Sequence, residues 1–371
     1  MKKTLKNIII AMAVAMLFIS CNADLENKGI FESMMTSAPN ADYTIQRFAG
    51  MLDGKFLIET NTGIETLTTQ GEKTTLLTGL QATVRFVDSV DNNIYYTVQT
   101  SGEKNNTLRY AALPTEEGAE IKDSKVATIK YGDENLYIVA SFYEDGEYYL
   151  LMQNEKGVYY IALASKGSLV EGDNENVFSF AEGNIHKCAV KQKKVTENGE
   201  EKVVDIPPDA TTYIGEGFYA VKYENWYLYN IDKKEIISSD EKGFANRPMA
   251  VENNVLFLQA KDGNNLFNIN GNSITPVTVD GNVVKHTISY FQFNQDLPMT
   301  TYDHKIFGCY GAKPFTFDGT TYADHESIGS GVVIIDMIHH TDGEFYAFSA
   351  ENGLYHSEDG QKYYRVEKPA K

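Results

Sequence analysis

The sequence predicts an all-β protein built from repeated four-stranded antiparallel units. Short runs of aromatic and β-branched residues alternate with polar residues at a period of two, which is typical of half-buried strands. Asp-Gly, Asn-Gly and Asn-Asn pairs separate these runs and favour tight hairpin turns, because such residues tolerate positive φ. Helical spacing is confined to a short segment at 30–35. With 42% hydrophobic and 23% charged residues, the chain of 371 has the composition of a folded globular protein.

Residues 1–20 have the three parts of an export signal. Three lysines within the first six residues are followed by an apolar stretch at 8–19, and Ser20 then precedes Cys21. The apolar stretch is too short to cross a hydrocarbon layer of roughly 30 Å as a helix. We therefore predict a signal peptide. An ordinary cleaved signal with a coincidental cysteine is the alternative.

The segment 17–21 (Leu-Phe-Ile-Ser-Cys) resembles a bacterial lipobox, in which the cysteine is diacylated and becomes the new N-terminus. The resemblance implies that Cys21 carries lipid such as palmitate and anchors the protein in the outer membrane, with 21–42 as a tether. The segment 22–26 resembles the acidic tag of Bacteroidota surface lipoproteins, although Leu25 separates its two acids. That similarity implies display at the cell surface.

Eight turns of one kind recur along the rest of the chain. Each pairs an acidic residue or Asn with a second turn residue, and they begin at Asp53, Asn92, Asp145, Glu182, Glu216, Asn253, Asp303 and Asp342. The strands that follow them start about 41 residues apart on average, which matches the period of a propeller blade of four strands. We therefore predict a single β-propeller over 43–371 with eight blades. Seven is the alternative, if 176–210 is an inserted hairpin.

A second kind of turn is clear in five of these units, and its best copy contains Ser357, Asp359 and Gly360. The other four copies contain Gly71, Gly199, Gly271 and Gly319. This turn resembles the Asp-box hairpin of sialidase-type and related propellers, in which Ser or Thr and Asp side chains cap a turn between the outer two strands. Gln361 and Tyr364 stand where that motif has Gly and Trp. The resemblance implies a structural role for these residues and no catalytic one.

Ligand binding is expected on the irregular loops, because the two kinds of repeated turn share the opposite face of a propeller. These irregular segments include 239–248 and 278–299, of which 278–299 is the longest. The candidate ligand-binding residues in and near them are Trp226, Arg247, Tyr290, Phe291 and Phe293. Aromatic side chains provide large, rigid contact surfaces for ligands. For each aromatic residue, a place in the hydrophobic core or on an inner strand is the alternative.

Several other chemistries are disfavoured by the sequence. A net charge of −18 argues against nucleic acid as a partner, since phosphate binding needs basic patches. Six of the seven histidines follow residue 285, but none has the spacing of a zinc site. There is no G-x-S-x-G motif, and none of the five arginines has the sequence context of the sialidase arginines. We therefore expect no cofactor, metal site or identifiable catalytic residue.

Two further cysteines lie in apolar, strand-like runs. Cys188 and Cys309 are 121 residues apart, and the repeat places them on second strands of two different blades. Their Cα atoms are then farther apart than the roughly 7 Å that a disulfide can bridge. We expect both to be buried free thiols.

Anchor and fold together favour a function in ligand capture. Lipid-anchored propellers in Bacteroidota are partners of outer-membrane transporters, so the resemblance implies binding of a small molecule or glycan for such a partner. A carbohydrate-active enzyme (lyase or hydrolase) and an envelope scaffold for protein interactions are the alternatives. A deep pocket with convergent acids would favour an enzyme, an aromatic cup would favour capture, and a flat surface would favour a protein partner.

Overall fold

The computed structural model consists of strands and turns, without a helix among the residues that it describes. It describes residues 41, 43–78, 82–99, 106–116, 118–144, 146–164, 167–172, 174–188, 191–197, 200–206, 208–237, 243–259, 266–279, 282–283, 298–318 and 322–366. Within these ranges no helix is long and apolar enough to cross a membrane. The signal peptide, Cys21 and nearly all of the predicted tether lie outside them.

Six sheets share one plan, in which four consecutive strands each pair antiparallel with the next. The first two consist of β1 (Ile45–Leu52), β2 (Lys55–Thr60), β3 (Gly63–Leu67) and β4 (Lys73–Thr78), then β5 (Ala82–Asp88), β6 (Asn93–Val98), β7 (Thr107–Ala112) and β8 (Lys125–Val126). Two more consist of β18 (Ala210–Tyr213), β19 (Phe218–Lys222), β20 (Trp226–Asn230) and β21 (Glu235–Ile237), then β22 (Arg247–Glu252), β23 (Val255–Gln259), β24 (Leu266–Asn270) and β25 (Ser273–Pro276). The last two consist of β28 (Met299–Tyr302), β29 (Lys305–Tyr310), β30 (Lys313–Phe317) and β31 (Tyr322–Asp324), then β32 (Ile334–His339), β33 (Phe345–Ser349), β34 (Gly353–Ser357) and β35 (Tyr364–Arg365).

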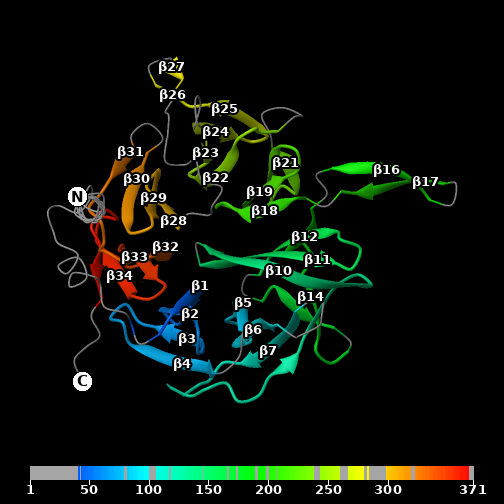
Figure 1. Cartoon of the computed structure of the whole chain (residues 1–371). Helices are drawn as coiled ribbons and strands as arrows, with labels where there is room; N and C mark the ends of the chain where they lie inside the picture. Colours follow the sequence, from blue (N-terminus) through cyan, green and yellow to red (C-terminus); the bar gives the residue numbers. More distant parts are fainter. Residues whose placement is uncertain are drawn as a thin grey trace, which may run out of the picture.

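A seven-stranded sheet and two small hairpins complete the described strands. The large sheet contains β9 (Thr128–Tyr131), β10 (Glu134–Glu144), β11 (Glu147–Asn154), β12 (Tyr159–Leu163), β13 (Leu169–Glu171), β14 (Val177–Phe180) and β15 (Ile185–Lys187) in the order β13-β14-β9-β10-β11-β12-β15. The hairpins are β16 (Gln192–Glu197) with β17 (Glu200–Asp205), which projects from the body in Figure 1, and β26 (Thr278–Val279) with β27 (Asn282–Val283). The segment at 178–205 therefore does not form a four-stranded sheet of its own, because β15 pairs with β12 instead.

Four turns of the first kind adopt the predicted backbone conformation, with positive φ at both turn residues. φ is 49° and 74° at Asp53 and Gly54, and 49° and 58° at Asn253 and Asn254. Glu216-Gly217 and Asp303-His304 also have two consecutive positive φ values. Two positive φ angles match the twist of adjacent strands, so each turn joins an inner strand tightly to the second strand of its sheet.

The sheets are arranged around a common centre, and neighbouring sheets pack face to face (Figure 1). Each contact is a shared cluster of buried apolar side chains, such as Leu228 with Leu256 between two successive sheets. The first and last sheets meet in the same way, since Phe48 stacks on Phe348 with ring centroids 4.8 Å apart. Antiparallel sheets packed radially, with apolar clusters between neighbours, define a β-propeller.

Cys188 and Cys309 are both buried and free, as predicted. Burial raises the pKa of each thiol to about 12, so both stay protonated. Cys309 lies on β29, the second strand of its sheet. The prediction of a second strand is wrong for Cys188, which directly follows β15 at the edge of the seven-stranded sheet.

Candidate functional site in the central cavity

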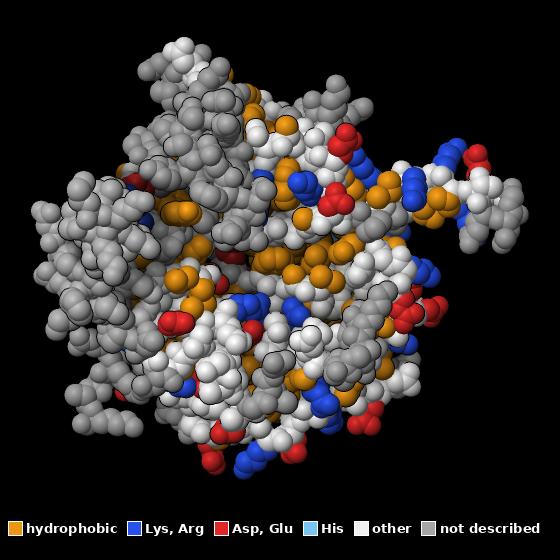
Figure 2. Space-filling view, viewed as in Figure 1, with side chains coloured by type: hydrophobic (Ala, Val, Ile, Leu, Met, Phe, Trp, Pro, Cys, Tyr) orange, Lys and Arg blue, Asp and Glu red, His pale blue; other side chains and the backbone are white. Residues whose placement is uncertain are grey.

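A cavity of about 1200 Å³ lies at the centre of the ring. Its walls come from the inner strands β1, β10, β18, β22, β28 and β32, from the turns that follow some of them, and from Tyr148 on β11. Figure 2 shows the hollow, with hydrophobic side chains around much of its rim and charged side chains beside it. Because several sheets contribute one strand each, the wall combines residues that are far apart in the sequence.

Bulges shape the inner strands that surround this cavity. The register with the second strand shifts between Phe48 and Gly50 in β1, and between Ile334 and Asp336 in β32. Similar shifts occur in β5, β10 and β22. A bulge inserts one extra residue and bends the strand, which changes the direction of nearby side chains. The bulge in β32 directly precedes Asp336, one of the ionisable residues of the cavity wall.

Arg47 on β1 joins three further strands at the cavity wall. Its guanidinium donates to Glu59 Oε1 from Nη2 and Nε at 2.7 and 3.1 Å, and Nη2 also donates to the carbonyl of Val84. Nη1 donates to the carbonyl oxygen and Oγ of Ser141 at 3.3 and 3.4 Å. Glu59 is nearly buried, so Arg47 supplies the charge that this carboxylate needs. The hydrogen bonds of the Arg47 guanidinium therefore connect β1 to β2, β5 and β10.

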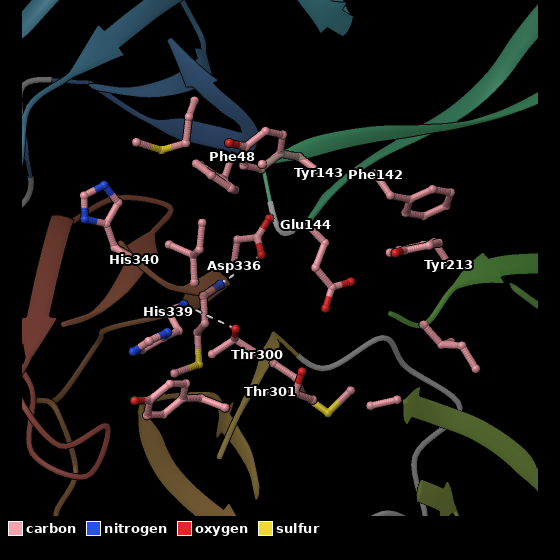
Figure 3. A pocket seen from close by; sticks show the side chains of 18 of the residues that line it. Phe48, Phe142, Tyr143, Glu144, Tyr213, Thr300, Thr301, Asp336, His339 and His340 are labelled. Carbon is pink, nitrogen blue, oxygen red and sulfur yellow. Dashed lines mark hydrogen bonds between the residues drawn. The ribbon is translucent and has the colours of Figure 1, made fainter. Parts of the chain in front are cut away.

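Two carboxyl groups, those of Asp336 and Glu144, reach into the cavity (Figure 3). Asp336 Oδ1 accepts a hydrogen bond of 2.9 Å from the amide of Met337. Burial raises the pKa of Asp336 to about 7, although this amide and the positive charge of Arg47 act in the opposite direction. Asp336 therefore carries a proton for part of the time at neutral pH.

Two histidines on the same wall differ in their partners. His340 is buried, and its Nδ1 lies 3.0 Å from Asp342 Oδ2. His339 stacks on Tyr302 with ring centroids 3.7 Å apart, and burial is the main cause that lowers its pKa. His339 Nε2 is buried and has no hydrogen-bond partner among the described residues. A buried polar atom without a partner carries an uncompensated desolvation penalty.

Aromatic rings form much of the remaining wall. Phe48 and Tyr143 pack edge to face with centroids 5.9 Å apart, on one side of the two carboxyl groups. Phe142 and Tyr213 lie on another side, with centroids 6.2 Å apart. Rigid aromatic walls with a few ionisable groups are typical of sites for organic ligands.

The structure brings two of the predicted ligand-binding residues together. Arg247 lines the cavity at the start of β22, and its guanidinium carbon lies 5.8 Å from the ring centroid of Trp226. Trp226 is on the third strand of its sheet and packs partly against the core cluster between two sheets. Lys222 Nζ also lies over this ring, at 5.3 Å. Tyr290, Phe291 and Phe293 lie outside the described residues.

The predicted structural turn near the C-terminus is a dense hydrogen-bonded unit between β34 and β35. Asp359 Oδ1 accepts from Ser357 Oγ at 3.0 Å and from the amides of Gln361 and Lys362 at 2.9 and 3.2 Å. Partial burial opposes ionisation of Asp359, but these hydrogen bonds hold its pKa below the usual range. Gly360 has a φ of 71°. These contacts cap a tight turn and place no reactive group in the cavity.

Sequence analysis missed the inner-strand residues and the turns at the cavity wall. Gly54, Gly146 and Gly343 belong to the first kind of turn, yet they line the cavity together with Asp336. Asp336 lies near the start of its inner strand, whereas these glycines follow the ends of theirs. The cavity therefore extends along the inner strands between the two faces. In the described part of the chain, no three His, Cys, Asp or Glu residues are grouped as a metal site requires.

Neither the models of known protein families nor the curated proteins give a match to this chain. Among solved structures, the extracellular domain of BT4673 from B. thetaiotaomicron is similar, with a TM-score of 0.48, 12% identity, and coverage of 86% of this chain and 43% of that one. The AfRom2 CNH domain has a TM-score of 0.44, 9% identity, and coverage of 86% and 96%. The WD40 domain of SCAP from fission yeast has a TM-score of 0.36, 10% identity, and coverage of 83% and 79%. These TM-scores are all below 0.5, so the fold is defined by the strand order of this chain alone.

Proposed function

We propose that the protein is an outer-membrane lipoprotein, exposed at the cell surface, that binds a small-molecule or glycan ligand in its central cavity for a partner transporter. The observation that supports binding is the cavity of about 1200 Å³ with aromatic and ionisable walls. Its volume is above the range of roughly 300–1000 Å³ that is usual for ligand pockets, so a sizeable ligand fits. Cys21 and the lipobox-like segment support the anchor.

We also infer that the ring has seven blades. In this interpretation β10, β11, β12 and β15 form the third blade, to which β9, β13 and β14 are added at one edge. The hairpin of β16 and β17 is then an insertion between the third and fourth blades. The order of strands in the seven-stranded sheet supports this count, because β15 takes the place of an outer strand.

Ligand binding should raise the melting temperature of the mature, lipid-free Cys21→Ala protein by mass action. We expect a hit in a thermal-shift screen with cobalamin, iron siderophores and glycans. Tyr302→Ala should weaken binding at least tenfold, because this ring stacks on His339 at the cavity wall. Tyr310→Ala is the matched control, since this tyrosine is similarly exposed on the same sheet but does not line the cavity. Equal loss in both variants would argue against the cavity as the site.

The anchor is tested separately through Cys21. Replacing Cys21 by Ala removes the thiol that a lipobox cysteine uses for acylation, and multiple acyl chains are needed for stable anchoring. We expect the Cys21→Ala protein to lose labelling by a palmitate analogue and to leave the membrane fraction. If it still incorporates lipid and still sediments with outer membranes, the lipobox interpretation is wrong.

A carbohydrate-active enzyme is the second candidate, and Asp336 is the observation that favours it. A carboxyl group with a pKa of about 7 in a cavity that also contains Glu144 has the properties of a general acid. The screen with glycans tests this candidate when the mixtures are analysed for cleavage products. Cleavage that disappears in Asp336→Asn would establish the enzyme; intact glycans after prolonged incubation would exclude it for those substrates.

A further inference from the structure

We propose that the ligand carries a positively charged nitrogen, an ammonium or quaternary ammonium group, which pairs with Asp336 in the central cavity. This inference rests on the proposed function, because it assigns a chemical class to the ligand of the same cavity. It is carried by the charge balance of the wall, by the missing counter-ion of Asp336 and by the aromatic rings around it.

The charge balance of the wall disfavours an anionic ligand. Among the residues that the structure describes, Asp336, Glu144 and Glu252 contribute carboxyl groups to the lining, and Arg47 and Arg247 contribute guanidinium groups. Arg47 is already paired with the nearly buried Glu59, which does not line the cavity. An anion beside Asp336 would lie close to Glu144 and would be repelled by Asp336 whenever that group is ionised.

Asp336 lacks the counter-ion that a desolvated carboxylate needs. No Lys, Arg or His within the described ranges lies within ion-pair distance of it, and its hydrogen bond comes from the neighbouring Met337 amide. An ionised carboxylate is costly to bury unless a charge partner is present. Without ligand, the group avoids this cost by keeping a proton. A ligand cation would supply the partner and release the proton to the buffer.

The surroundings of Asp336 suit a cation more than a neutral polyol. Phe48 and Tyr143 lie on one side of the carboxyl group and Glu144 on another (Figure 3). A cationic nitrogen gains attraction from the carboxylates and from the partly buried ring of Tyr143, whereas a neutral hydroxyl group gains hydrogen bonds alone. The aromatic wall therefore increases the preference for a cationic ligand over a neutral one, beyond the preference that the carboxyl groups give.

The pH dependence is set by Asp336 together with the other charged and titratable groups that line the cavity. Within the described residues these are Arg47 from β1, Tyr143 and Glu144 from β10, Tyr148 from β11, Tyr213 from β18, Arg247 and Glu252 from β22, Tyr302 from β28, and His339 and His340 from β32 and the turn after it. The pKa of Asp336 is raised in the folded protein, so the proton must leave as the cation binds. Cation binding should tighten as the pH rises from 5 to 8, and it should release a proton near pH 7.

The test uses three probes of the same shape: choline (charge +1), 3,3-dimethyl-1-butanol (neutral) and 3,3-dimethylbutyrate (charge −1). Calorimetric titration of the mature Cys21→Ala protein should give binding by choline that is at least tenfold tighter than by either isostere. The heat should depend on the ionisation enthalpy of the buffer, because a proton is released. Asp336→Asn should abolish both the preference and the proton release, whereas Glu358→Gln, an exposed site outside the cavity, should change neither.

Each other outcome contradicts the inference. Equal binding of choline and its neutral isostere, tighter binding of the anion, or unchanged choline binding by Asp336→Asn would overturn it. If choline does not bind while a neutral or anionic ligand from the thermal-shift screen does, the cation inference fails and the proposed function stands. If neither the probes nor the screen gives binding, both fail.

Discussion

Replacing Arg47 by Met is expected to destabilise the protein by about 3 kcal/mol, because breaking a buried ion pair leaves its partner charge uncompensated. Glu59 is 8% exposed, and its Oε1 would keep the hydrogen bond of 2.6 Å from the amide of Val84. The variant would also lose the bonds from Arg47 to Val84 and Ser141. Urea denaturation should show a lower midpoint with an unchanged slope.

The matched control for this prediction removes the charge of Glu59 as well. In the double variant Arg47→Met with Glu59→Gln, no buried carboxylate is left without a cation, so part of the lost stability should return. A coupling energy near zero, or a midpoint in Arg47→Met equal to that of the wild type, would show that Arg47 does not hold β2, β5 and β10 together.

Replacing Gly360 by Val should have a comparable effect, about 3 kcal/mol, through overpacking and backbone strain combined. Gly360 has a φ of 71°, and a Cβ atom there would clash with the ring of Phe307 on the neighbouring sheet. Because the Asp359 turn is structural, this variant should melt earlier but keep its ligand affinity once folded.

Gly271→Val separates the two causes. Gly271 has a φ of 64° in the equivalent turn between β24 and β25, but a Cβ atom there would have no neighbour within 4 Å. This variant carries the strain without the clash, so it should cost about 1–2 kcal/mol. Equal losses of stability in the two variants would rule out the contact with Phe307 as a cause.

The sequence carries most of the information about the fold in its turns. Pairs such as Asp53-Gly54 and Asn253-Asn254 adopt positive φ in the structure, and tight turns of this kind mark successive sheets. The spacing of the turns predicted a separate blade after Glu182-Gly183, and this prediction is wrong. The two residues of this turn are of the same types as those of the other turns. The strand after that turn, Ile185–Lys187, has only three residues and completes the preceding sheet. Local turn chemistry does not specify which strand a segment pairs with, because pairing depends on distant partners.

The cavity was harder to predict from the sequence, because its residues are far apart in the chain and come together only when the sheets pack around the centre. Arg47 and Ser141 are 94 residues apart, and nothing in either local segment indicates their contact. The inner-strand bulges are likewise set by pairing with a neighbour. One signal was present: Asp336 is a single acid within an apolar strand, and such a residue costs free energy unless it has a partner or a function. Arg247 was identified as a candidate from its place in a loop, and it does line the cavity.

The most direct test of the central claim is a crystal structure of the protein with the tightest ligand from the thermal-shift screen. We expect ligand density inside the ring, between β10 and β32, with a polar group of the ligand within hydrogen-bond distance of Asp336. Density on the outer loops, with the central cavity free of ligand, would contradict the claim that this propeller binds its ligand at its centre.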